Sequence, residues 1–277
     1  MTTLAEPRPA RPEPLPERGG SRFLWGLRSE LTKLLSVRST YWTLLAMVVV
    51  NVGLGVLICL VTAATWDKTA APAKAAFDPT ATSLSGMFLG QLIIAVLGTL
   101  TISSEYSTGM VRTALAAQPH RFTYIAAKAV VFAAVAYVAG VVVTFCSFLI
   151  GQAVLHSTGA AASLSDPGVL RSMFGGGFFI AGCGLFGFAI AVSLRHAAGA
   201  ISAAAGVLFV GPVLVNFLPT HWQDNVNKWL PSTAGSRIME IKVPAHQFAP
   251  WTGLGVFGLY VAALLVVGIV LFVRRDA

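Results

Sequence analysis

The densest group of residues that could do chemistry lies between Ser103 and Arg121, in a polar stretch flanked by two long apolar runs. Its charged and hydroxyl groups suit binding, but they form no recognisable nucleophile and base. Ser107 or Thr108 can cap a short helix, and Gln118-Pro119 ends it, because the residue before a proline leaves helical geometry. One apolar face of that helix would hold Met110, Val111, Ala114 and Leu115. The stretch predicts a docking element.

Other patterns that could carry chemistry have simpler explanations. The glycine patterns at 182–187 and 253–258 match the dinucleotide fingerprint, but they fall at or within apolar runs, where glycine permits close helix packing. Cys59, Cys146 and Cys183 are too scattered for a zinc or disulfide framework. No Gly-x-x-x-x-Gly-Lys-Ser/Thr loop occurs, so we do not expect this chain to hydrolyse ATP. We therefore expect no catalytic residue, bound metal or cofactor.

Composition indicates the class of protein. Of the 277 residues, 56% are hydrophobic and 11% are charged, and the mean hydropathy is +0.75. A soluble domain holds about 25% charged residues, so much of this apolar surface must face lipid. The net charge of +8 does not indicate a nucleic-acid partner, because basic residues that flank membrane spans set their orientation.

Six apolar segments are long enough to cross a bilayer. Their expected bounds are Tyr41–Ala63, Leu84–Ile102, Tyr124–Leu155, Met173–Leu194, Ala198–Leu218 and Thr252–Val273. The third is too long for a perpendicular crossing, so we expect it to tilt or to extend beyond the bilayer. The expected fold class is an all-α integral membrane protein, with six transmembrane helices in one domain over residues 39–277.

The distribution of basic residues predicts orientation. The majority lie on the side of the amino terminus: Arg8, Arg11, Arg18, Arg22, Arg28, Lys33, Arg38, Arg112, Arg121, Lys128, Arg195, Arg274 and Arg275. The opposite side holds Lys68, Lys74, Arg171, Lys228, Arg237 and Lys242. By the positive-inside rule, both termini and the loop 103–123 face the cytoplasm, and the loop 219–250 lies outside the cytoplasmic membrane.

Two segments precede the first span. Residues 1–20 alternate proline with charged and small residues, which predicts a disordered cytoplasmic tail. In residues 21–38, one helical face of roughly 120° predicts an amphipathic helix at the inner membrane surface. That face holds Phe23, Leu24, Leu27, Leu31, Leu34 and Leu35. An early start of the first span is the alternative, which Arg28, Glu30 and Lys33 disfavour because charge is costly in hydrocarbon.

Three segments carry a resemblance to a known family. Glu105–Arg112 resembles the first cytoplasmic loop of type-2 ATP-binding-cassette (ABC) exporter permeases, especially small actinobacterial members. Ser29–Ser39 is similar to their amino-terminal helix, and Leu230–Gly235 is similar to a segment before their last span. The first match continues downstream in Pro119, Arg121 and Lys128. The resemblance covers nearly the whole chain after residue 20.

The resemblance implies a permease that exports cargo by alternating access. It implies a second permease copy, as a homodimer or a related chain, and two separate cytoplasmic ABC ATPase subunits that bind ATP and Mg²⁺. A loop helix would insert into a groove on the ATPase. The implied coupling residues are Glu105, Tyr106, Gly109, Met110, Val111, Arg112 and Leu115. Among them Met110, Val111 and Leu115 would supply apolar contacts; Glu105 and Arg112 would fix the loop or, alternatively, only mark the membrane boundary.

The expected cargo is amphipathic or hydrophobic, such as a drug, lipid or peptide, because the spans carry a few amides and hydroxyls in apolar walls. The candidate pathway residues are Asn51, Gln91, Thr99 and Asn216. The spans contain no Asp, Glu or His near their midpoints, so the sequence gives no sign of proton coupling. The alternative function is a membrane anchor or regulatory subunit that transports nothing. In both cases the chain would be surrounded by membrane lipid, which is a further expected partner.

In the family, the loop before the last span holds short helices that dip back toward the membrane. The corresponding region is residues 219–250, followed by Trp251. Residues that suit a membrane interface there are Trp222, Trp229, Ile238 and Trp251. The region could form an outer gate or a simple amphipathic cap. His221 and His246 lie in the same loop, where a zinc site is the alternative to two hydrated histidines.

Overall fold

The computed structural model describes residues 19–117, 120–244 and 246–274. In these ranges the regular structure is helical, without strands, and six helices are long and apolar enough to cross a membrane. This confirms the predicted six-span fold class. The tail predicted at residues 1–20 falls almost wholly outside the described residues. Gln118-Pro119, the predicted helix end, also lies outside them.

The six spans have well-defined bounds. Five of them are α2 (Arg38–Thr65), α5 (Met87–Ser107), α7 (Arg121–Leu155), α8 (Val169–Leu194) and α13 (Pro250–Arg274). The fifth span in chain order consists of α9 (Ala197–Ala205), the π-helical turn η3 (Gly206–Val210) and α10 (Gly211–Val215). The shorter helices are α1 (Gly19–Ser36), η1 (Trp66–Lys68), α3 (Ala71–Ala76), α4 (Pro79–Ser83), α6 (Met110–Ala117), η2 (His156–Thr158), α11 (Thr220–Asn227), α12 (Pro231–Ser236) and η4 (Arg237–Met239).

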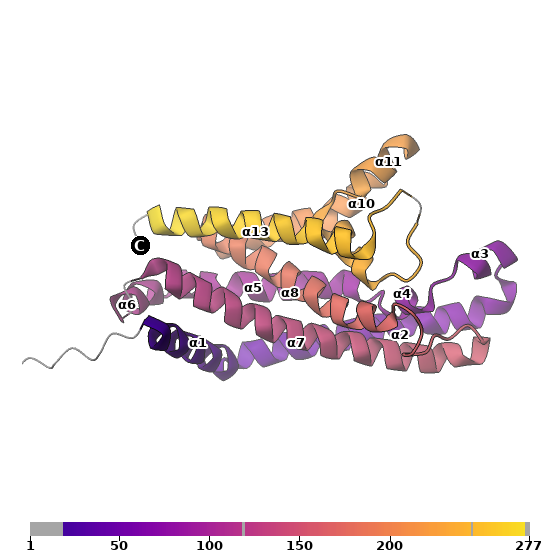
Figure 1. Cartoon of the computed structure of the whole chain (residues 1–277), viewed down its shortest axis with the longest axis horizontal. Coiled ribbons are helices and arrows are strands. Elements are labelled where there is room, and N and C mark those ends of the chain that lie inside the picture. Colours follow the sequence, from indigo (N-terminus) through magenta and orange to yellow (C-terminus); the bar gives the residue numbers. More distant parts are fainter. Residues whose placement is uncertain (1–18, 118–119, 245, 275–277) are drawn as a thin grey trace, which may run out of the picture.

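Helix α7 is the longest element. Its 35 residues correspond to about 52 Å at the α-helical rise, whereas a bilayer core is about 30 Å thick. Figure 1 shows α7 running along most of the bundle. A helix of this length must tilt strongly or continue past the hydrocarbon, as its sequence predicts.

Helix α1 is separate from the first span. Val37 between the two helices is extended (φ −82°, ψ 115°), which ends α1 before α2 begins. Leu34 packs into the core, whereas Leu24, Leu31 and Leu35 are exposed. The apolar face therefore divides between the protein interior and the surroundings, where lipid would cover the exposed leucines.

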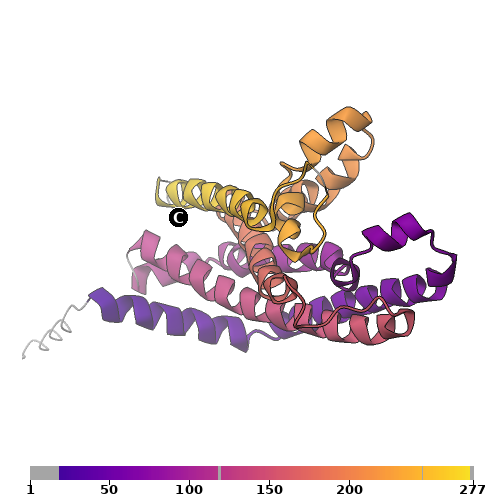
Figure 2. The same cartoon turned by 45° about the vertical axis from the view of Figure 1, so that its right-hand side comes forward.

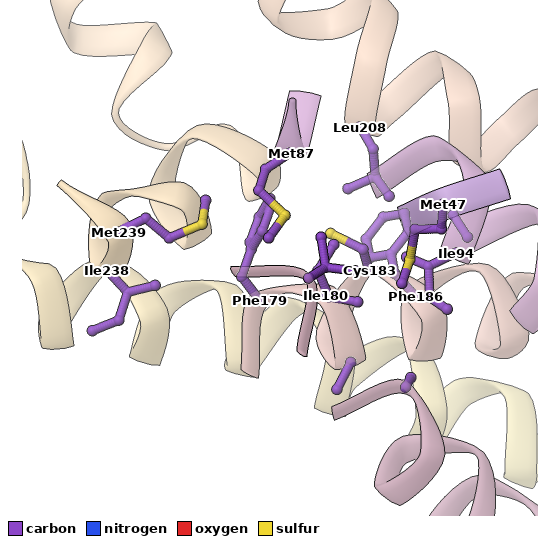
Figure 3. Close-up of a cluster of buried hydrophobic side chains, with 14 of the residues drawn as sticks. Met47, Met87, Ile94, Phe179, Ile180, Cys183, Phe186, Leu208, Ile238 and Met239 are labelled. Atoms are coloured by element: carbon purple, nitrogen blue, oxygen red, sulfur yellow. The ribbon is translucent and has the colours of Figure 1, made fainter. Parts of the chain in front are cut away.

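Helix α8 is the most buried of the six spans. It lies between α5, α7 and α13, and its glycines allow close approach, because Gly184 and Gly187 touch neighbouring helices with no room for a side chain. Figure 3 shows the cluster around it. The labelled side chains from α8 are Phe179, Ile180, Cys183 and Phe186, which meet Met47, Met87, Ile94, Leu208, Ile238 and Met239.

The glycine patterns therefore act in packing, but only in part. Gly182 would clash with Phe257 if it carried a Cβ, and Gly253 would clash with the Ala234 carbonyl. Gly255 and Gly258, in contrast, have no atom within 4 Å of the added Cβ. The packing explanation holds for the first pattern and for the first glycine of the second.

Alanine at Gly98 should force α5 and α8 apart. Its Cβ would lie 2.0 Å from the Gly184 carbonyl oxygen, which is backbone and cannot rotate away. We expect Gly98→Ala to cost about 1–3 kcal/mol of stability. Thermal unfolding in detergent measures this, and Gly255→Ala, whose Cβ meets open space, is the matched control. Equal unfolding temperatures in the two variants would show that the crossing is less tight than described.

The two ends of the bundle differ. One end gathers α1, α6 and the carboxyl end of α13, whereas α3 and α4 lie at the other (Figure 1). Helix α11 projects from the bundle in both views (Figures 1 and 2). Helix α12 is instead buried against α8 and α13, so the segment before the last span contains one projecting and one packed short helix.

Candidate functional site

The polar stretch after α5 forms a turn and a short helix. Gly109 adopts φ +70°, a left-handed conformation, and α6 begins at the next residue. The hydroxyls of Ser107 and Thr108 each donate to the Ser104 carbonyl oxygen, 2.9 Å away. The predicted capping role is therefore not what these hydroxyls do, because they bond back to α5. The glycine conformation makes the turn instead.

One face of α6 is turned into the protein. Val111 is only 3% exposed and packs in a cluster with Ile102, Tyr124 and Phe272, and Leu115 packs against the same cluster. These side chains hold α6 onto the bundle. The buried Val111 side chain is not accessible to a partner in this conformation, whereas Leu115 is half-buried and its predicted docking contact stays a prediction.

The other face of α6 is open. Met110 is 48% exposed although it is large and apolar. The exposed residues of this turn and helix are Ser107, Thr108, Gly109, Met110, Arg112, Thr113 and Ala116. We call these residues the α6 face. Its only large apolar side chain is Met110, and Arg112 supplies its charge.

A charge cluster lies behind α6, where α1, α5 and α7 meet. Lys128 of α7 donates to Glu30 of α1 and to Glu105 of α5, with 2.9 Å to the Glu105 Oε1. Lys33 of α1 lies 2.6 Å from Glu30 Oε1 and 3.8 Å from Glu105 Oε1. The hydroxyl of Tyr124 donates to Glu105 Oε2. We call these five side chains the charge cluster.

The charge cluster is largely withdrawn from water. The side chains of Lys128, Glu30 and Glu105 are 4%, 7% and 10% exposed, whereas Lys33 is 40% exposed. Dehydrated charges are stable only when paired and hydrogen-bonded, and here two ammonium groups balance two carboxylates. The pairing therefore joins α1, α5 and α7, since moving α5 or α7 away would leave a buried charge of the cluster without its partner.

Aromatic residues extend this joint to the remaining helices. The ring of Phe272, near the end of α13, lies 6.3 Å from the ring of Tyr124 and 6.5 Å from that of Tyr106. Arg195, after α8, lies over the Tyr106 ring at 5.6 Å. Arg121 donates to the Val273 carbonyl oxygen at 3.2 Å. At the end of the bundle that carries α6, the charge cluster and these aromatic and arginine contacts thus form one packed unit.

The other predicted site residues of this end are placed differently. Glu30 and Lys33 belong to the charge cluster, whereas Arg28 is exposed on α1. Arg112 is exposed on the α6 face. The structure therefore joins Glu105 and Tyr106 to the packed unit and leaves Met110 and Arg112 on its surface.

The four predicted pathway residues do not form one site. Asn51 is fully buried, with its side chain against Gly90 of α5 and its backbone against Gly86. Thr99 is fully buried and donates to the Ala95 carbonyl oxygen at 2.9 Å. Gln91 is 3% exposed and lines a cavity. Asn216 is exposed after α10.

Sequence reasoning gave no role to Tyr124 and Lys128. A sequence signal existed, because an ionisable residue well inside an apolar span usually has a partner. Tyr124 and Lys128 are also four residues apart, so they share a helix face. What the sequence could not supply was the partner, because Glu30 is 98 residues away along the chain.

The charge cluster joins three helices through its ion pairs. Among the described residues, no three His, Cys, Asp or Glu side chains are grouped to hold a metal. The carboxylates of the charge cluster are occupied by lysines and a tyrosine. A push on the α6 face would reach α5 through the turn, and α1 and α7 through the charge cluster.

Comparison with known proteins gives one family. The model of a family described as ABC-2 family transporter protein matches residues 27–217, more than half of the chain. The matched range contains α6 and every member of the charge cluster. A comparison with curated proteins found no match.

Proposed function

The chain belongs to the ABC-2 transporter family, and from that premise we propose that it is the permease of an ATP-driven exporter. ABC-2 permeases are multi-pass membrane proteins that work with ABC ATPase subunits and do not hydrolyse ATP themselves. The family match confirms the predicted family, and it leaves the actinobacterial subgroup untested. The direction of transport, the cargo, the orientation of the chain in the membrane and the number of subunits are part of the proposal.

The observation that carries the proposal is the charge cluster behind the α6 face. A partner that moves the α6 face meets a helix whose inner side, at Val111, is locked into the bundle. Because Lys128 bonds to Glu105 and Glu30 together, α5 and α7 cannot shift independently of α1. A local push thus becomes a joint movement of α1, α5 and α7.

We assign the α6 face to the cytoplasm, where two ATPase subunits would bind ATP and Mg²⁺. The positive-inside rule supports this assignment, because Arg112, Arg121 and Arg274 lie at this end of the bundle. Met110 would enter an apolar groove on the ATPase, and Arg112 would pair with an acidic group at its rim. Val111 acts instead by holding α6 in place.

We further propose that two copies of the chain enclose a pathway for an amphipathic or hydrophobic cargo such as a drug. Gln91 and Asn216, near the end opposite α6, are its first candidates. Asn51 and Thr99 are enclosed by helix contacts in this conformation. They could reach a pathway only if α2 and α8 separated from α5 during transport.

The test of the coupling role is Met110→Asp. A charged group would have to enter the apolar groove, so we expect at least tenfold less ATPase to be recovered with the tagged chain in mild detergent. Ser157→Asp adds the same charge on an exposed residue at the other end of α7 and should leave recovery unchanged. Full ATPase recovery with Met110→Asp would contradict docking through the α6 face.

Transport itself needs a second measurement. In reconstituted vesicles, cargo movement should require the ATPase and ATP, and it should be lost with Met110→Asp. Movement without any ATPase subunit would refute the exporter. An ATPase bound at normal stoichiometry with no cargo-stimulated ATP hydrolysis would favour the alternative, a membrane anchor or regulatory subunit.

A further inference from the structure

A cavity of about 210 Å³ lies away from α6, in the outer half of the bundle as oriented above. Its walls come from the loop before α5, from the first turns of α5, and from α8, α10 and α12. The lining residues include Ser85, Met87, Gln91, Phe179, Ser232 and Glu240.

Three residues that line the cavity carry a buried polar atom without a partner. The Oε1 of Gln91 and the Oγ atoms of Ser85 and Ser232 are buried, and none has a hydrogen-bond partner in the described part of the chain. The whole residues Gln91 and Ser232 are only 3% and 4% exposed. Buried polar atoms are nearly always bonded, and leaving them unbonded is destabilising. Three such groups around one cavity indicate a polar guest.

The rest of the lining is apolar. Met87, Phe179 and Met239 face the same space. The labelled Met87, Phe179 and Met239 side chains stand close to one another in Figure 3. Binding sites for small molecules combine such walls with a few placed polar groups. The guest therefore carries hydrogen-bonding groups on an otherwise apolar body.

The charges at the cavity select against an anion. Glu240 contributes to the lining, and both of its carboxylate oxygens are held by Arg237 at 2.6 and 2.7 Å. No lysine or arginine is among the lining residues. An anionic head group would meet the Glu240 carboxylate and no lysine or arginine of the described lining, which disfavours an anion. A cationic group would find both Glu240 oxygens already paired with Arg237, so an uncharged guest fits best.

The neighbouring helix can adapt to a guest. Pro212, which lines the cavity, is the second residue of α10, which directly follows the π-helical turn η3. π-Helical turns are rare and frequently occur at functional sites. The ring of Phe209 lies 4.6 Å from that of Phe88, which also lines the cavity. A change in η3 would therefore alter the wall formed by α5 and α10.

We propose that this cavity binds the hydroxyl-bearing head group of an uncharged amphiphile. Rotation of these side chains toward the cavity would let the Gln91 oxygen accept from one hydroxyl and let Ser85 and Ser232 exchange hydrogen bonds with another. The apolar body lies against Met87 and Phe179. The amphiphile could be the exported cargo, and that identification alone rests on the proposed function. Binding of the amphiphile to the cavity does not depend on the proposed function.

The probe is radiolabelled 1-monooctanoylglycerol, whose uncharged head carries two hydroxyls. It is added to the full chain in lipid nanodiscs that contain no ATPase. We expect saturable binding that weakens about tenfold in Gln91→Leu and about fivefold in Ser232→Ala, the effect of one lost hydrogen bond. Thr101→Val, which removes a hydroxyl on α5 outside the cavity, should bind like the unchanged chain.

Three results would overturn the proposal. They are no saturable binding, binding in both cavity variants equal to that of the unchanged chain, or tighter binding of the corresponding glycerol phosphate than of 1-monooctanoylglycerol. If Gln91→Leu does not fold, Ser232→Ala decides alone. A second experiment tests whether the ligand is exported cargo or a resident lipid. Stimulation of ATP hydrolysis in the complex with its ATPase identifies cargo, whereas binding without stimulation identifies a resident lipid. Because the binding arm contains no ATPase, failure of the exporter leaves its result unchanged.

Discussion

Lys128→Met should unfold at a temperature lower by roughly 6–20 °C than the unchanged chain. The substitution keeps the length of the side chain but leaves Glu30 and Glu105 buried with only the half-exposed Lys33 between them. Breaking a buried ion pair costs about 3–5 kcal/mol, and a protein of this size loses about 2–4 °C per kcal/mol. Thermal unfolding in detergent, followed by size-exclusion chromatography, measures the shift.

The second expected effect of Lys128→Met is on coupling. Where the variant still folds at low temperature, ATP hydrolysis by the complex should no longer respond to cargo, because α7 is released from α1 and α5. The ATPase should still bind, since the α6 face is unchanged. This separates loss of transmission from loss of docking, which Met110→Asp tests.

Two further variants bracket this result. Lys128→Met combined with Glu105→Gln restores equal numbers of positive and negative charges, so it should regain part of the lost unfolding temperature. Lys68→Met removes an exposed lysine at the other end and should change nothing. If Lys128→Met unfolded like Lys68→Met, the charge cluster would not hold the three helices together.

The spans could be predicted from sequence because lipid imposes a simple rule on length and polarity. All six predicted segments overlap the spans of the structure, and the break at Val37 separates the amphipathic helix from the first of them. Hydropathy is a local property, so each segment carries its own signal. The same rule says nothing of the π-helical turn η3, whose five residues are as apolar as their neighbours.

The candidate site could be predicted only in part, because its members come from different helices. The apolar stripe of α6 is visible in sequence, but the stripe does not say whether it faces a partner or the chain itself. Val111 faces the chain and Leu115 packs partly against it, a placement that the stripe alone could not indicate. Lys128 was visible as a charge, and its function depends on Glu30 and Glu105, which only folding brings to it.

Gly109→Pro should abolish recovery of the ATPase with the chain. Gly109 has φ +70°, and proline is fixed near −65°, so the turn between α5 and α6 cannot form. Proline also removes the backbone N–H that donates to the Tyr106 carbonyl oxygen at 3.3 Å. The α6 face would then point elsewhere, while the six spans would stay folded because nothing packs on Gly109.

A graded series separates backbone geometry from loss of contact at this position. A Cβ at residue 109 would meet no atom within 4 Å, so any effect of Gly109→Ala comes from the left-handed conformation, about 1–2 kcal/mol. Asparagine tolerates this conformation better. ATPase recovery should therefore fall in the order Gly, Asn, Ala, Pro, whereas the unfolding temperature should fall by only a few degrees. Equal recovery across the series would mean that the angle of the α6 face does not determine docking, and the face would have to bind as a flexible segment.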